Sequence, residues 1–317
     1  RQRTRSYNFS INSQVYNNAF YVSARGLFYQ RHDAITAPFA STEYARGGCP
    51  ELAEIDISHS GSAAFNSGSD YPVGSQMNIT GGWLDAGDYG RYVPTAALAV
   101  NLILTAYEIY PERFTDNFLN LPESGNGVPD LLDEARVELD WLLQMQAPDG
   151  GVYFKVTTPA YAGSMPAQDN FLRYIAEKTT FSTGHFAAVM AEAYRVYHEF
   201  DSAFADTCLN RAVLAWQFLE NHPTEIPVGG FSNLGNGGGG EYGDPGGDSD
   251  ERAWAAAELY KSTGDTAYHS AFEFYWLQHS PDWGWNEFQH HQRRASWAYC
   301  TTTDFPIDSN YFNSYVN

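Results

Sequence analysis

Two aspartates, Asp85 and Asp88, lie three residues apart in the segment GGWLDAGDYGRYV, residues 81–93. An aspartate carboxylate is ionised at neutral pH and can take a proton from a bound water, which makes that water a nucleophile. A second carboxylate can hold the water's other hydrogen, and its charge raises the proton affinity of the first. The same residues also fit a capped turn that leads into a helix at Pro94. Spacing alone therefore leaves catalysis and a structural turn both open.

A second acidic cluster lies in the segment EYGDPGGDSDE. Calcium takes about six to eight oxygen ligands, often from carboxylates on a flexible loop that contains glycine. The segment predicts a structural calcium site with the ligands Asp244, Asp248, Asp250 and Glu251. The alternative is a helix start, where acidic residues are favoured by the helix dipole. Both interpretations can hold together.

Composition excludes some partners. The 317-residue chain has a formal net charge of −20, whereas a protein that binds a phosphate backbone needs a basic face, so we expect no nucleic-acid partner. No apolar run approaches the roughly 18 residues of a membrane span, so we expect no membrane partner. Aromatic residues make up 16% of the chain and suit a ligand with flat apolar faces, such as a sugar ring.

Hydrophobic periodicity predicts a mainly α fold with polar, glycine-rich connections. Helices are expected over residues 15–31, 94–110, 126–146, 181–199, 204–220, 250–262 and 267–277, with another beginning near residue 309. The best alternating strand is 152–156, and the longest irregular stretches are 37–78, 157–178 and 224–247. Such a succession suggests a helical toroid in which the loops of one face build the site.

The segment 81–93 closely resembles the signature of glycoside hydrolase family 9, the inverting cellulases, and its wording DAGDYGRYV is similar to a branch that often carries an immunoglobulin-like domain. Four further segments resemble those of the family in the same order: 123–146, 150–158, 181–197 and 240–265. The resemblance implies an (α/α)6 six-hairpin barrel with an open cleft for β-1,4-glucan. It also implies that residues 1–317 belong to one catalytic domain, without a separate second domain.

Carried over by position, Asp88 is the general base and Asp85 helps to hold the attacking water. Inversion also needs a general acid across the glycosidic bond, at roughly 6.5–9.5 Å. The family's acid is a glutamate near the end of a longer domain, so we expect it beyond residue 317. The barrel is then incomplete over these residues, and we expect residues 1–317 alone to be inactive. Nothing around Glu287 matches an acid, and we interpret His290 and His291 as surface histidines of a helix.

The resemblance also suggests ligand contacts. Sugar contacts are expected from Tyr92, Lys155, His185, Tyr242 and Trp285, although a histidine in the core is an alternative for His185. Family members carry calcium near the second acidic cluster. In the similar branch a zinc site uses two cysteines and two histidines, but only His32, Cys49 and perhaps His59 match here. Since a structural zinc normally takes four ligands, this zinc site looks degenerate.

The sequence therefore predicts a secreted glycoside hydrolase that acts on a β-glucan polysaccharide or oligosaccharide. One alternative is a non-catalytic carbohydrate-binding protein on a decayed hydrolase scaffold. Another is an exo-acting glucosidase or glucosaminidase of the same family, because loops at the cleft ends decide between endo and exo action. A sugar epimerase or polysaccharide lyase on a similar toroid is less consistent, since those typically use histidine or tyrosine bases.

Overall fold

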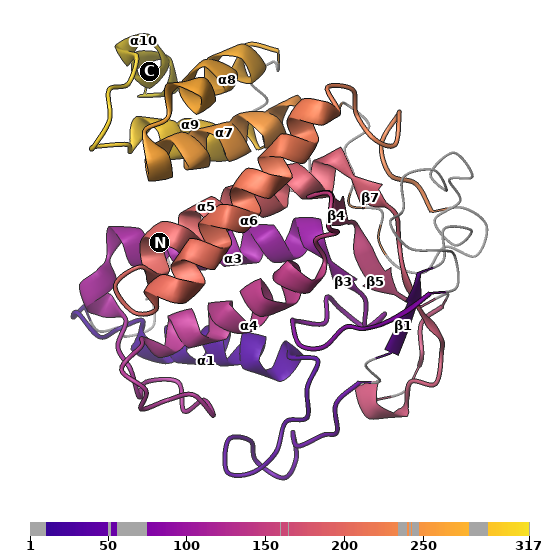
Figure 1. The fold of residues 1–317 in the computed structure, drawn as a ribbon. Coiled ribbons are helices and arrows are strands. Elements are labelled where there is room, and N and C mark those ends of the chain that lie inside the picture. The colour runs from indigo at the N-terminus through magenta and orange to yellow at the C-terminus, as the bar shows by residue number, and fades with distance from the viewer. Residues whose placement is uncertain are drawn as a thin grey trace, which may run out of the picture.

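The computed structural model describes residues 11–49, 52–55, 75–158, 160–163, 165–233, 240, 242, 247–278 and 291–316, without the side chains of 52–55 and 314–316. Helices dominate these residues (Figure 1). They are α1 (Asn17–Gln30), α3 (Val93–Ile109), α4 (Asp130–Gln144), α5 (Thr180–Tyr197), α6 (Ser202–Asn221), α7 (Ser249–Thr263), α8 (Thr266–Trp276), α9 (Gln292–Cys300) and α10 (Ser309–Val316). The predicted mainly α fold is confirmed, and α9 was not predicted as a separate helix.

Helices α3, α5, α7 and α9 form a series in which each packs against the next. Helices α6 and α8 pack beside the helices that precede them in the chain, α5 and α7 (Figure 1). The N-terminal ends of α5 and α6 are defined by capping side chains, because Thr179 accepts a hydrogen bond from the Ser182 amide and Asp201 from the Phe204 amide. Loss of such a cap typically costs about 1 kcal/mol.

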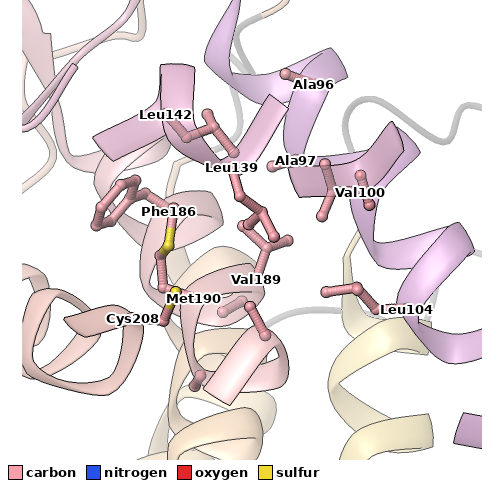
Figure 2. Close-up of a cluster of buried hydrophobic side chains, with 14 of the residues drawn as sticks. Ala96, Ala97, Val100, Leu104, Leu139, Leu142, Phe186, Val189, Met190 and Cys208 are labelled. Carbon is pink, nitrogen blue, oxygen red and sulfur yellow. The ribbon is translucent and has the colours of Figure 1, made fainter. Parts of the chain in front are cut away.

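The core fills the space between α3, α4, α5 and α6 (Figure 2). It contains Val100 and Leu104 of α3, Leu139 and Leu142 of α4, Phe186, Val189 and Met190 of α5, and Cys208 of α6. Near the N-terminal ends of α5 and α7, a Cβ atom added at Gly184 would lie 2.7 Å from the Cβ of Glu251. Glycine at this position therefore lets α5 approach α7 closely.

Short strands form a sheet with the order β2-β1-β6-β5-β3. The strands are β1 (Leu52–Ile55), β2 (Gln76–Asn78), β3 (Arg91–Tyr92), β5 (Lys155–Thr157) and β6 (Arg173–Ile175), and β4 (Val152–Tyr153) pairs separately with β7 (Lys178–Thr179). The single strand predicted over 152–156 is wrong in detail, because the chain changes sheets at Phe154. The other strands have two to four residues, too few for an alternating pattern to be recognised.

These strands lead into the helices at one end of the molecule (Figure 1). Strand β3 is followed directly by α3, and β7 directly by α5. The pairing of β3 with β5 places Tyr92 opposite Lys155. The loop before β3, which carries Asp85 and Asp88, is thus fixed at the N-terminal end of the helices. Within the described ranges, no helix combines the length and the apolar character that crossing a bilayer requires.

Candidate active site

The loop that carries the two aspartates is held by hydrogen bonds at several points. The Leu84 amide donates to the Gln30 carbonyl at 2.7 Å, and the Asp85 amide donates to the Gly90 carbonyl at 2.8 Å. The amide of Trp83 donates to Glu138 at 2.5 Å and its indole N–H donates to Glu134 at 2.8 Å. Such anchoring gives Asp85 and Asp88 a defined orientation relative to the helix ends.

Asp88 is buried, with 4% of its surface exposed. Its Oδ1 accepts the Gly90 amide at 3.0 Å, and its Oδ2 accepts the Tyr92 hydroxyl at 2.5 Å. Burial, together with the hydrogen bond and the charge of Asp88, raises the pKa of the Tyr92 phenol far above its ordinary value. Tyr92 therefore remains a protonated donor to the carboxylate. The Tyr92 oxygen also accepts the Gly240 amide at 3.0 Å, which fixes its position.

Asp85 is half-buried and is held by two hydroxyl groups. Tyr242 donates to its Oδ2 at 2.7 Å and Thr95 to its Oδ1 at 3.2 Å. Burial raises the pKa of the Asp85 carboxyl, the Tyr242 hydrogen bond opposes this shift, and the charge of Asp88 adds to it. The rings of Tyr92 and Tyr242 meet edge to face, with centroids 4.9 Å apart. The two aspartates are thus held by two tyrosines that contact each other.

Asp85 faces a partly open pocket of about 280 Å³. Trp83, Tyr92, Thr95 and Glu138 also line this pocket, which lies between α1, α3 and α4. Burial raises the pKa of Glu138 to about 8. Because its Oε2 accepts a hydrogen bond from the Trp83 amide, Glu138 fixes the loop that carries the aspartates to α4. Glu138 was not identified from the sequence, and it lies on the buried face of α4 among apolar residues.

Lys155 and His185, both predicted to contact a sugar, are fully buried. The Lys155 ammonium donates to Asn233 at 2.7 Å and to the Gly240 carbonyl at 3.0 Å, so it holds the segment that supports Tyr92. His185 lies inside the core between helices. In the described structure the contacts of both side chains are therefore inside the protein. Tyr92 is likewise buried behind Asp88, Tyr242 adjoins the pocket wall, and Trp285 lies outside the described residues.

The interpretation of His291 as a surface histidine is wrong, because the residue is 0% exposed. It occupies the N-cap position of α9, where its amide donates to Asp250 Oδ2 at 2.6 Å. Its ring contacts His185, which is 106 positions away in the sequence. A local sequence pattern cannot show a contact between residues that are so far apart in the chain. His290 and Glu287 lie outside the described residues.

The predicted calcium ligands have different partners in the structure. Both carboxylate oxygens of Asp248 bind Arg252, at 2.8 and 2.9 Å, and Asp250 accepts the amide of His291. Glu251 faces the ring of His291, and Asp244 lies outside the described residues. The described members therefore do not fit the all-oxygen shell that calcium prefers. Calcium binding at this segment stays a prediction.

Two of the three candidate zinc ligands are described. The Cys49 amide donates to the His32 carbonyl at 2.9 Å, and both side chains are buried. His59 lies outside the described residues. The group of three metal-ligating side chains that the described residues do bring together consists of His185, Glu251 and His291. Zinc binding near the N-terminus stays a prediction.

Comparison with known proteins places this geometry in a family. The model of the family described as "Glycosyl hydrolase family 9" matches residues 16–310. Endoglucanase D of Acetivibrio thermocellus is 34% identical over 275 residues, which cover 85% of this chain and 41% of that protein. A xyloglucan-specific endo-beta-1,4-glucanase of Bacteroides ovatus is also 34% identical over 275 residues, covering 83% of this chain and 45% of that protein.

Solved structures agree with the sequence comparison. The crystal structure of a metagenome-derived glycoside hydrolase family 9 endoglucanase matches with a TM-score of 0.84 and 36% identity, over 95% of this chain and 53% of that one. The expected (α/α)6 barrel class is therefore confirmed. The chain spans about two fifths of the length of the curated relatives it matches.

Proposed function

Because the chain belongs to glycosyl hydrolase family 9, we propose that it hydrolyses β-1,4-glucan with inversion at the anomeric carbon. The observation that carries this proposal is the pair Asp85 and Asp88, held on one loop by two tyrosine hydroxyls. Relatives named as endoglucanases support the substrate class. Acting on a polysaccharide too large to enter a cell, the protein would be secreted, as the sequence predicts.

In the proposed reaction, Asp88 takes a proton from a water while the water's oxygen bonds to the anomeric carbon. Asp85 accepts the other hydrogen of that water and so orients it. The carboxylate oxygens of Asp88 each have a second lone pair beyond the donors Gly90 and Tyr92, so the base can accept the water's proton. The bond from the anomeric carbon to the leaving oxygen breaks, and a general acid protonates that oxygen. For this acid we keep the expectation of a family glutamate beyond residue 317.

The two tyrosines set the geometry of this step. Tyr92 donates one hydrogen bond to Asp88 and Tyr242 donates one to Asp85, which leaves other lone pairs of the carboxylates for the water. The two rings pack edge to face, so each ring supports the position of the other. Placement of this kind matters because small errors in the position of a reacting group lower the rate strongly.

The test uses the full-length protein with soluble cello-oligosaccharides and xyloglucan oligosaccharides. Proton NMR of the first products should show the α-anomer, because inversion at a β-linkage produces it. A β-anomer as first product would contradict the inverting mechanism. Binding of the glucan without release of reducing ends would instead support the carbohydrate-binding alternative. The product lengths separate endo from exo action.

A further inference from the structure

Three metal-ligating side chains meet where the N-terminal ends of α5, α7 and α9 come together (Figure 1). They are His185 of α5, Glu251 in the first turn of α7 and His291 at the N-cap of α9, each 0% exposed. One ligand atom from each lies within 4.8 Å of the other two. The proposed hydrolysis uses none of these side chains, so this cluster needs its own explanation.

The hydrogen bonding of His185 fixes which of its nitrogens can bind a metal. Its Nδ1 lies 2.9 Å from the Phe181 carbonyl, and a carbonyl can only accept, so Nδ1 carries the proton. The lone pair is then on Nε2, which lies 3.0 Å from Nε2 of His291. Histidines that bind metals typically donate their other ring N–H to a backbone carbonyl in this way. His185 is thus oriented as a ligand.

Three carboxylate oxygens beside the two rings lack a well-placed donor within the described residues. Oε1 of Glu251 lies 3.4 Å from Nε2 of His291, and within the described residues neither of its oxygens accepts a hydrogen bond of good geometry, although the Asp250 carboxyl and its own amide lie nearby. Oδ1 of the adjacent Asp250 is also buried without a donor there. Buried carboxyl groups in proteins are normally protonated, paired or bound to metals, and one bound cation would satisfy all three of these oxygens.

We propose that His185, Glu251 and His291 bind one divalent transition-metal ion of the zinc type. Zinc bonds to histidine nitrogen at roughly 2.0–2.1 Å, and a tetrahedron with such bonds separates its ligand atoms by about 3.4 Å. The observed separations of 3.0 Å between the two Nε2 atoms and 3.4 Å from Nε2 of His291 to Glu251 are close to this value. Two imidazole ligands favour zinc over calcium, which prefers oxygen.

Such an ion would be structural. Its ligands come from three helix ends, and the ring of Trp254 stacks on His291 with centroids 5.5 Å apart, which shields the site from solvent. Binding to the native state alone would stabilise the packing of α5, α7 and α9. The site shares Glu251 with the predicted calcium site but takes its other two ligands from histidines. It contains neither of the predicted zinc ligands His32 and Cys49, and it does not depend on the proposed hydrolysis.

The first experiment measures zinc binding by the full-length protein. Metal is removed with a chelator, zinc is added back, and unbound zinc is removed by dialysis. One zinc per chain by elemental analysis is expected, together with the absorption bands of tetrahedral cobalt when Co²⁺ replaces zinc. The variants His185→Ala and His291→Ala should weaken zinc binding by more than about 100-fold. The control His198→Ala changes an exposed histidine just after α5 and should bind zinc as the wild type does. Equal zinc binding by His185→Ala, or displacement of zinc by millimolar calcium, would overturn the proposal.

A second measurement does not require a stable variant. Crystals of the wild-type protein grown with zinc are measured on both sides of the zinc absorption edge. An anomalous difference peak between Nε2 of His185 and Nε2 of His291 supports the site. The absence of a peak there overturns it, whether or not zinc is bound elsewhere.

Discussion

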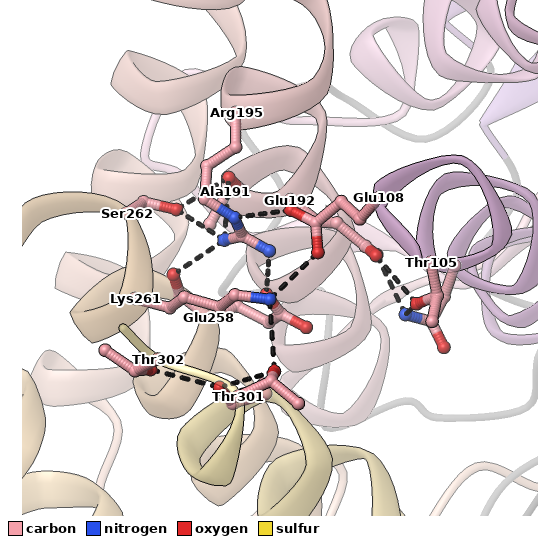
Figure 3. A network of polar contacts seen from close by, with 12 residues as sticks. Thr105, Glu108, Ala191, Glu192, Arg195, Glu258, Lys261, Ser262, Thr301 and Thr302 are labelled. Carbon is pink, nitrogen blue, oxygen red and sulfur yellow. Dashed lines mark hydrogen bonds and ion pairs between the residues drawn. The ribbon is translucent and has the colours of Figure 1, made fainter. Parts of the chain in front are cut away.

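Buried and partly buried carboxylates at the two ends of the α3, α5 and α7 helices have different partners. At the C-terminal ends, Glu108 and Glu258 form ion pairs with Arg195 at 2.8 and 2.7 Å, and Lys261 binds Glu108 at 2.8 Å (Figure 3). Glu192 accepts hydrogen bonds from Asn101 and Thr105, at 2.8 Å each. Cations in the last turn of a helix are also favoured by its dipole.

At the N-terminal ends, the described structure shows no lysine or arginine paired with Asp85, Asp88 or Glu251. The aspartates have tyrosine hydroxyls as partners, and Glu251 has imidazoles. A carboxylate paired with arginine is held in its charged form and serves stability, whereas one with neutral partners remains able to take a proton or a metal ion. At the N-terminal end the buried pair of Asp248 with Arg252 is an exception that serves stability. Apart from this pair, the comparison suggests that the C-terminal end of the helix layer is built for stability and the N-terminal end for chemistry.

The largest expected effect is at the N-terminal end. Asp88→Ala in the full-length protein should lower kcat/KM on soluble β-1,4-glucan by about 10²–10⁴-fold, because the general base is removed. Circular dichroism should show an intact fold. Asp140→Ala is the control, since Asp140 is half exposed and, in the described part of the chain, its ion pair is with Arg136 on the surface. Near-full activity of a folded Asp88→Ala variant would refute the assignment.

The C-terminal end should respond in stability instead. Arg195→Met leaves Glu108 and Glu258 without their partly buried arginine and should lower the free energy of unfolding by about 3 kcal/mol, the lower end of the range for buried pairs. The activity of the remaining folded protein should be unchanged. Urea unfolding measures the first quantity and an assay at low temperature the second. Arg113→Met, at an exposed pair with Glu112, should change stability by less than about 1 kcal/mol.

A loss of activity without loss of stability in Arg195→Met would contradict the division between the two ends. It would mean that the cationic cluster acts on the catalytic loop through the helices. Equal destabilisation by Arg113→Met would show that the variant's effect is not specific to a buried ion pair.

A smaller effect is expected from moving a tyrosine rather than removing a carboxylate. A Cβ atom at Gly90 would lie 2.6 Å from the ring and hydroxyl of Tyr92, so Gly90→Ala should displace the donor to Asp88. We expect kcat/KM to fall by about 10- to 100-fold with little change in KM. Gly87→Ala is a matched control on the same loop, because a Cβ there meets nothing within 4 Å. Equal losses in both variants would show that loop flexibility, not Tyr92, matters.

The helices could be predicted from the sequence because a period near 3.6 is a local signal. The segment 126–146, for example, predicts α4, which runs from Asp130 to Gln144. The aspartate pair was also recognisable, because both residues lie on one short loop. The tyrosine partners were named only as sugar contacts, since no local pattern shows that Tyr242 reaches Asp85 from 157 positions away.

The acidic segment that contains Asp248 and Glu251 also shows what local sequence cannot predict. The carboxylates and glycines of this segment, together with the family resemblance, predicted one oxygen site. In the structure Asp248 binds Arg252, four residues later, while Glu251 faces His291. The start of the helix separates these side chains, because each residue of a helix is turned by about 100° from the one before it, so Asp248 and Glu251 meet different neighbours. The neighbours of Glu251, on α5 and α9, are distant in sequence and could not be read from the segment itself.

The smallest expected effect is a change in pH dependence. Burial raises the pKa of Asp85, and the hydrogen bond from Tyr242 opposes that shift. Tyr242→Phe removes the donor and keeps the ring against Tyr92, so the pKa of Asp85 should rise further. If Asp85 must be ionised to hold the water, the acid limb of the kcat/KM profile moves to higher pH. The plateau value of kcat/KM should change less than in any of the variants above.

The same pKa shift also affects stability. The contribution of a carboxyl with a raised pKa to stability is present at low pH and is lost as the pH rises through the pKa of the folded state. Tyr110→Phe, at an exposed tyrosine after α3, should leave the profile unchanged. An acid limb that stays in place or moves to lower pH in Tyr242→Phe would show that Asp85 does not need its charge for the reaction, and the carboxylates of the N-terminal end would then differ from one another in function.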